Sequence, residues 1–161
     1  MRPIFTLGVA ALCLAATSAA AQPKPPREFL KDALQGDNSE MRLGDLAAQR
    51  AASPAVRDFG RTLHDDHARA REEALRVAQR VGVPDTQAMA PEARQEARRL
   101  DRLRGRAFDR EFIRYMIHDH RKDIADFRKA SRRGGPVGDL ASRTLPDLQR
   151  HLQMAQQLDR G

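Results

Sequence analysis

The residues of this sequence best suited to chemistry are one glutamate and three histidines that interrupt apolar stripes: Glu40, His67, His120 and His151. Neutral imidazole nitrogens and carboxylate oxygens are ligands that transition metals take in proteins. Burying four such side chains without partners is costly, and one cation satisfies their lone pairs together. The set therefore predicts a metal site in the core, with zinc as the first candidate and iron, copper or nickel as alternatives.

Four protein ligands fill a tetrahedral zinc site, which makes such a site structural or a store of metal rather than catalytic. Asp123 lies one helical turn from His120, and His64 lies one turn from His67. We expect Asp123 and His64 to support the site or to act as alternative ligands. A di-iron centre needs Glu-x-x-His units, and the chain has none. A redox metalloenzyme is therefore the least favoured interpretation.

A second interpretation of the same side chains needs no metal. A buried histidine or glutamate is more often a hydrogen-bonded core residue, and here Asp123 or Glu40 would orient an imidazole within a polar network. Other polar residues fall off the apolar stripes. We expect His118 and the Asp65-Asp66 pair to face solvent, and Tyr115 to pack rather than react.

The elements that must position these residues are helices. Apolar residues recur at helical spacing over four long segments and one short one, with Pro and Gly signals between them. The long segments are 27–51, 54–81, 107–133 and 137–158, and the short helix is 91–103, which Gly105 ends.

Four amphipathic helices of this length, each ~33 to 42 Å long at 1.5 Å per residue, bury their stripes only by packing side by side. The fold class is therefore all-α, and a four-helix bundle is the expected architecture. The connector between the second and third long helices is long enough to cross the bundle, as in ferritin-like folds. An up-and-down bundle with a decorated loop is the open alternative.

The spacing also places the four candidate ligands at one height. Glu40 and His67 lie about thirteen residues on either side of the Ser53-Pro54 turn, which is roughly 20 Å along each helix. His120 and His151 lie about fifteen and sixteen residues on either side of Gly135. All four are near mid-helix, so they coincide in height under either topology.

Composition excludes several classes of protein. One cysteine cannot build a disulfide scaffold, and 40% hydrophobic residues are too many for a wholly disordered chain. The net charge is +7, but the basic residues alternate with acids as on solvated helix faces. We therefore expect no nucleic-acid partner, and at most weak contact with an anionic envelope surface. The sequence contains no glycine-rich phosphate-binding loop and no nucleophile motif of the kind that indicates an enzyme.

The N-terminus has the pattern of a signal peptide. A basic start, an apolar run from Ile4 to Ala16 and the small residues Ala19-Ala20-Ala21 predict cleavage after Ala21. Cys13 would leave with this leader. We expect a periplasmic or secreted protein, with residues 1–21 as the leader, 22–26 as a flexible lead-in and 27–161 as the bundle domain.

The sequence resembles domain-of-unknown-function family 4142, whose members are exported proteins similar to ferritin-like bundles. The resemblance rests on Phe29-Leu30-Lys31, Glu40 with Leu43-Gly44, Val56-Arg57-Asp58-Phe59, Asp66-His67, Phe108-Asp109 leading to Met116 and His120, and Leu145-Pro146 leading to His151-Leu152. It implies that Glu40, His67, His120 and His151 are the shared motif positions, and it implies no established activity. His64 departs from the aliphatic residue expected there. Residues 116–120 are also loosely similar to another exported ferritin-like family linked to copper.

Two hypotheses follow. The first is an exported ferritin-like bundle that binds a transition metal, for metal buffering or envelope stress tolerance. The second is a structural or interaction module of the cell envelope, without enzymatic activity, whose core polar residues form a metal-free hydrogen-bond network.

Overall fold

The computed structural model describes residues 22–161. These residues form five helices and no strand, as the all-α expectation requires. The helices are α1 (Pro26–Arg50), α2 (Pro54–Arg80), α3 (Pro91–Leu100), α4 (Gly105–Ser131) and α5 (Gly135–Leu158). The expected signal peptide, with Cys13, lies outside the described residues. No helix in the range 22–161 is long and apolar enough to cross a membrane.

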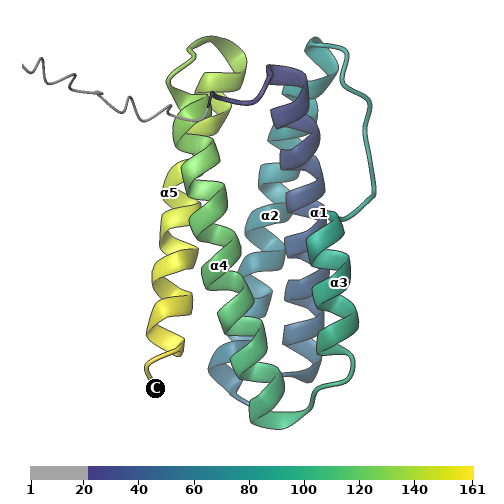
Figure 1. Ribbon diagram of the computed structural model, residues 1–161, viewed down its shortest axis with the longest axis vertical. Helices are drawn as coiled ribbons and strands as arrows, with labels where there is room; N and C mark the ends of the chain where they lie inside the picture. Colours follow the sequence, from purple (N-terminus) through teal and green to yellow (C-terminus); the bar gives the residue numbers. More distant parts are fainter. Residues whose placement is uncertain (1–21) are drawn as a thin grey trace, which may run out of the picture.

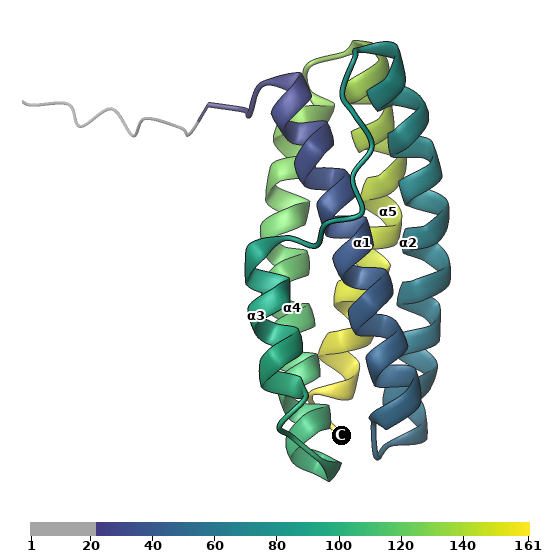
Figure 2. The same ribbon diagram turned by 90° about the vertical axis from the view of Figure 1, so that its right-hand side faces the viewer.

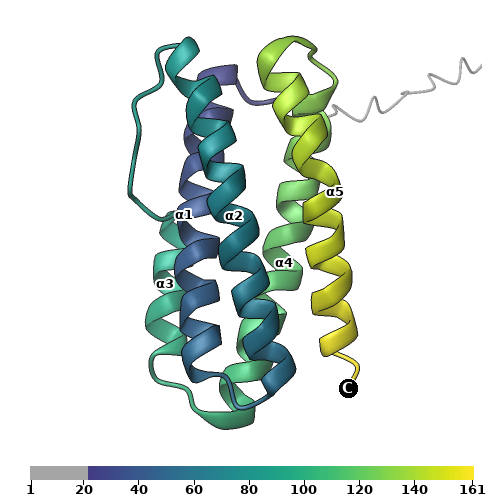
Figure 3. The same cartoon turned by 180° about the vertical axis from the view of Figure 1, so that it is seen from behind.

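The four long helices pack as two antiparallel hairpins that together make a four-helix bundle (Figure 1). The first hairpin is α1 with α2, and the second is α4 with α5. Between the hairpins, α2 packs on α5 and α1 packs on α4. Seen from behind, the C-terminal end of α5 lies at the same end of the bundle as the α1–α2 turn (Figure 3).

The connector of residues 81–104 runs the length of the bundle. It leaves α2 at one end, passes outside α1, and continues as α3 to the far end, where α4 begins (Figure 2). As a result α2 and α4 point in the same direction. The sequence alone allowed either a connector that crosses the bundle or an up-and-down bundle with a decorated loop. In the structure it lies on one side of the bundle, with α3 packed against α1 and α4.

Proline marks the first turn of α1, α2, α3 and α5, where its missing N–H leaves no helical hydrogen bond unmade. Several expected helix boundaries were wrong. The short helix ends at Leu100 rather than at residue 103, and Gly105 opens α4 instead of ending α3. Gly105 has a φ of 58°, a conformation that glycine adopts without steric cost, and it turns the chain into the next helix. Likewise Gly135-Pro136 begins α5 rather than preceding it.

A glycine pair brings α1 and α2 into backbone contact. A Cβ added to Gly44 would lie 2.6 Å from the carbonyl oxygen of Gly60, and a Cβ added to Gly60 would lie 2.6 Å from that of Gly44. This contact fixes the register of the hairpin. Asp37 and His67 lie seven residues from Gly44 and Gly60 respectively, so both lie ~10 Å from the contact along their helices, and they meet each other.

The apolar core has two parts. The cluster toward the α1–α2 turn is built around Leu43, Phe59, Phe108, Phe112 and Met116. The cluster toward the other end of the bundle is built around Leu30, Leu34, Ala78, Leu140 and Ala141. A layer of buried polar residues lies at the height between them, including Asp37, Glu40, His67, His120 and His151. The polar layer is thus enclosed by hydrophobic packing on both sides.

Candidate metal centre

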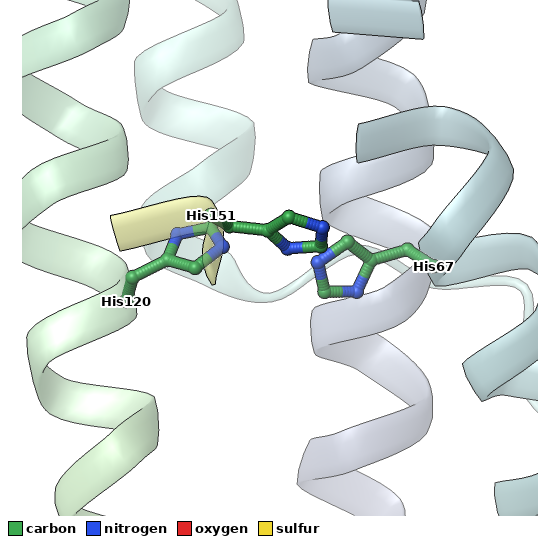
Figure 4. A group of neighbouring side chains, drawn as sticks. All are labelled: His67, His120 and His151. Carbon is green, nitrogen blue, oxygen red and sulfur yellow. The ribbon is translucent and has the colours of Figure 1, made fainter. Parts of the chain in front are cut away.

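Three histidines from three helices meet in the polar layer. His67 comes from α2, His120 from α4 and His151 from α5, and their side chains point toward one another (Figure 4). They are 4%, 1% and 1% exposed. One ring nitrogen from each lies within 4.8 Å of its counterparts on the other two. The ring centroids are 5.3 to 6.0 Å apart.

One nitrogen of each ring contacts an oxygen outside the group. His67 Nδ1 is 2.9 Å from Asp37 Oδ1, His120 Nδ1 is 3.0 Å from the Met116 carbonyl, and His151 Nε2 is 2.8 Å from Asp66 Oδ2. A carbonyl or an ionised carboxylate only accepts hydrogen bonds, so these nitrogens donate. In a neutral imidazole the other nitrogen then carries the lone pair. The outer oxygens therefore fix the tautomers.

The remaining nitrogens have no hydrogen-bond partner. His67 Nε2, His120 Nε2 and His151 Nδ1 are all fully buried and unpaired among residues 22–161. A buried polar atom without a partner costs free energy on the order of 1–3 kcal/mol. Three such atoms in one small group form a set that a single cation would satisfy, because each would donate its lone pair to the ion.

The electrostatics keep two of these imidazoles, those of His120 and His151, neutral. Burial lowers the pKa of His120 well below its ordinary value, and the neighbouring His67 and His151 add to this effect. Burial also lowers the pKa of His151 to about 4, although the hydrogen bond to Asp66 opposes the shift. Metal binding requires neutral imidazole, so at neutral pH these two rings are ready to bind without losing a proton.

The pKa values of the two outer carboxylates are shifted in opposite directions. Burial raises the pKa of Asp37, against the hydrogen bond from His67 and the charge of Arg71. Burial would also raise the pKa of Asp66, but its hydrogen bond with His151 and the charge of Arg150 outweigh burial and lower it. Asp66 therefore keeps its negative charge to a lower pH than Asp37 does. A histidine–carboxylate pair of this kind orients a metal ligand and raises its basicity.

Sequence reasoning missed both outer carboxylates. It expected the Asp65-Asp66 pair to face solvent. The structure corrects this for Asp66, whose side chain is turned toward α5 and also accepts from Arg150 Nη2 at 2.6 Å. Position alone does not reveal this role, because Asp66 lies off the apolar stripe of α2. Asp37 carried a clearer signal, since it lies one turn before Glu40 on the same face of α1.

The other candidate ligands lie outside the histidine group, which in the described part of the chain contains only the three histidines. Glu40 is buried in the same layer, with both carboxylate oxygens unpaired. Asp123 lines a cavity of about 360 Å³ that His67 also borders. His64 is partly exposed and forms an ion pair with Asp45 across the α1–α2 seam, with Nδ1 2.9 Å from Oδ1.

One protein family and one solved structure are similar to this chain. A family model described as a domain of unknown function (DUF4142) matches residues 11–158. Among solved structures, a crystal structure of a DUF305 fragment from Deinococcus radiodurans is similar, with a TM-score of 0.74 and 20% sequence identity. The match covers 88% of this chain and 100% of that one, and at this identity it supports the shared fold alone. No curated protein matches the chain.

Proposed function

The chain belongs to the DUF4142 family, and we propose that it binds one transition-metal ion in the bundle core through His67 Nε2, His120 Nε2 and His151 Nδ1. The observation that carries the proposal is the set of three buried, unpaired nitrogens in rings whose other nitrogens are already engaged. A metal-free hydrogen-bond network would leave these three lone pairs facing one another. A bound cation removes that penalty.

Zinc is the ion that this donor set suits best. Zinc takes neutral imidazoles whose second nitrogen donates to a carboxylate or carbonyl, and all three rings have such a partner. Copper(I) favours thiolate or thioether ligands, and non-haem iron favours a carboxylate beside two histidines. The close group contains neither sulfur nor carboxylate. Copper and iron are therefore second to zinc.

Three protein ligands leave the fourth position of a tetrahedral zinc open. The four-ligand set expected from the sequence included Glu40, which is not a member of the close group. An open position takes a water molecule or an exogenous ligand, so the protein alone does not complete the coordination of the ion. We therefore assign the site to reversible metal buffering rather than to permanent structural support.

The wider setting of the proposal is an exported ferritin-like protein. The signal-peptide pattern of residues 1–21 supports export to the periplasm. The connector that makes α2 parallel to α4 supports a ferritin-like relationship, because those bundles use one long crossover. In the envelope, such a protein would hold metal during fluctuations in supply and so contribute to stress tolerance.

Elemental analysis tests the binding proposal. The protein is purified without a metal-binding tag, stripped, reconstituted with zinc and desalted. We expect one zinc ion per chain, and loss of that ion in His120→Ala and in His151→Ala. His118→Ala is the matched control, because His118 is exposed on α4 two residues from His120. A wild-type protein that retains no zinc, or loss of zinc in the control, contradicts the proposal and favours the metal-free network.

A further inference from the structure

The charged residues of α4 are segregated by the side of the helix on which they lie. Along the sequence its basic residues alternate with acids, which predicted at most weak contact with an anionic surface. In the structure all five acids of α4 are buried or half-buried. Its exposed residues, apart from Gly105 and Ala125, are all arginine, lysine or histidine. These seven residues form the α4 basic face: Arg106, Arg110, Arg114, His118, Arg121, Lys122 and Arg128.

Two of the acids of α4 are engaged by other parts of the chain. Asp109 accepts hydrogen bonds from the backbone N–H groups of Ala52 and Ser53, at 2.9 and 2.8 Å. Asp126 forms an ion pair with Lys24, whose Nζ is 3.0 Å from Oδ2. These carboxylates join α4 to the rest of the bundle, so they do not offset the charge on its outer side.

Most of the α4 basic face has no acidic partner. Arg114 pairs with Glu111, and Lys122 acts on Asp123 as a counter-charge. Within residues 22–161, the four remaining arginines of the face form no ion pair: Arg106, Arg110, Arg121 and Arg128. Their positive charge is therefore available to a partner outside the chain.

The exposed side of α2 shows a different arrangement. Arg61 pairs with Asp58, and Arg76 pairs with Glu72, each within one turn of the helix. Such pairs stabilise a helix, whereas like charges four residues apart destabilise it. The first three members of the α4 basic face are arginines four residues apart with no exposed acid between them. The α4 basic face thus carries a repulsion that an anionic partner would relieve.

A surface pocket lies within this face. It has a volume of about 520 Å³ and lies between α4 and the C-terminal end of α5. Arg114, His118, Arg121 and Arg160 line it, with Asp159 as its one acid. A guanidinium group binds a phosphate through two parallel N–H donors. The pocket therefore suits a phosphate group bound by arginines of two helices.

We propose that the α4 basic face docks on a membrane surface of anionic phospholipids, with lipid phosphate groups in the pocket. From its first to its last member the face spans 22 residues, a strip ~33 Å long. Because α3 and α5 flank α4 (Figure 1), the helix does not protrude as a helix must to enter a groove of duplex DNA. A planar array of phosphates matches this strip.

The composition of the face favours lipid over single-stranded nucleic acid. Proteins that bind single strands stack bases on exposed aromatic side chains, and no aromatic side chain of α4 is exposed. Ala125 is the one exposed apolar side chain of the helix. The attraction is therefore electrostatic, without insertion into the hydrocarbon core, and it weakens as salt screens the charges.

Vesicle co-sedimentation tests the proposal. The purified protein should bind vesicles of equimolar phosphatidylglycerol and phosphatidylcholine, and should not bind vesicles of phosphatidylcholine alone. The neutral vesicles report any binding that is independent of lipid charge, such as binding by the apolar residues 4–16. Raising the salt concentration should release the protein, because the Debye length falls from about 10 Å at 0.1 M to about 3 Å at 1 M.

A triple variant locates the docking face. Arg110→Gln, Arg121→Gln and Arg128→Gln in one chain should weaken binding to the mixed vesicles on the order of 100-fold. Each basic residue near an anionic surface contributes about a fivefold factor to the partition coefficient. All three side chains are exposed, so the variant should fold, and circular dichroism checks that it does.

The control carries the same change of net charge on α2. It replaces three exposed arginines by glutamine: Arg61, Arg76 and Arg80. This control should bind the mixed vesicles at least about tenfold more tightly than the α4 variant does. Equal binding of the two triple variants, or equal binding of the wild type to both kinds of vesicle, would overturn the proposal.

Two further measurements identify the partner and separate it from the metal site. A DNA duplex that binds the wild type more tightly than the mixed vesicles do, at the same salt concentration, would assign the face to nucleic acid and overturn the lipid assignment. His120→Ala, which should lose zinc, should bind the mixed vesicles as the wild type does. Docking is thus independent of the histidine site, and either proposal can fail without the other.

Discussion

At the scale of single residues, the orientation of each imidazole depends on one hydrogen bond to an outer oxygen. The bond from His151 Nε2 to Asp66 Oδ2, at 2.8 Å, leaves Nδ1 as the nitrogen with the lone pair. Asp66 has a lowered pKa, so its charge also makes the ring a better electron-pair donor. The outer carboxylate is therefore a positioning residue of the proposed site.

This role predicts a selective effect of Asp66→Asn. The amide keeps the shape but removes the charge, and it can donate to Nε2 and so reverse the tautomer. We expect zinc affinity to fall on the order of 10–100-fold, measured by competition with a chelating dye. Asp65→Asn is the control, because Asp65 is exposed on the same turn of α2. Equal affinities for the two variants would show that Asp66 does not orient a ligand.

At the scale of helices, the close approach of α1 and α2 sets the register that the site needs. Gly60→Ala would place a Cβ 2.6 Å from the backbone oxygen of Gly44, and backbone cannot rotate away as a side chain can. We expect a loss of about 1–3 kcal/mol in the free energy of unfolding, since overpacking forces the helices apart. Zinc affinity should fall with it, because Asp37 and His67 separate.

Chemical denaturation of the metal-free protein measures this loss, and Gly36→Ala is the matched control on α1. A Cβ at Gly36 meets only one side-chain atom, at 4.0 Å. Replacing a helical glycine by alanine there should stabilise the protein by about 0.5–1 kcal/mol. A destabilising Gly36→Ala together with a neutral Gly60→Ala would refute the role of the glycine contact.

The packing of α3 on α4 should depend on pH. Glu96 on α3 is buried with Oε1 unpaired, and burial, followed by the charge of Glu111 on α4, raises its pKa from 4.5 to about 7. The folded state therefore holds this proton up to about pH 7, while the unfolded chain releases it above about pH 4.5. Stability contributed by the protonated group is thus lost as pH rises between these values.

Glu96→Gln mimics the protonated carboxyl, so the variant should not lose stability as the pH rises. At pH 8 the variant should be more stable than the wild type by roughly 2 kcal/mol, and at pH 4 the two should be nearly equal. Denaturation at both pH values checks the difference, with the exposed Glu92→Gln on the same helix as the control. A constant difference across pH would exclude titration of Glu96 as its cause.

At the scale of the whole molecule, the proposed zinc ion joins the two hairpins. His67 belongs to the α1–α2 hairpin, while His120 and His151 belong to the α4–α5 hairpin. The ion would act as a cross-link at the height where the apolar core is divided. Binding to the folded state alone stabilises it by about 4 kcal/mol when free metal is a thousand times the dissociation constant.

Metal removal should therefore lower the melting temperature. We expect a chelator to destabilise the zinc-loaded wild type, because the hairpins lose their shared ion, and to leave His151→Ala unchanged. Differential scanning calorimetry with and without chelator measures this, and His118→Ala should behave as the wild type does. An identical melting temperature with and without chelator would show that the ion does not bridge the hairpins.

Much of the fold follows from local sequence pattern. Helical periodicity and proline signals specify the four long helices, because each depends on residues close together in the chain. Gly105 shows where this reasoning failed. The same residue can end one helix or begin another, and only the direction of the following chain decides.

The sequence by itself determined that His67, His120 and His151 share one height, because the rise per residue fixes distance from the turns. Tertiary structure decided which side chains face one another at that height. Rotation of each helix about its axis, set by contacts such as Gly44 with Gly60, turns the three histidines inward together and Asp66 toward His151. Such rotation depends on packing between distant segments, which local spacing does not encode.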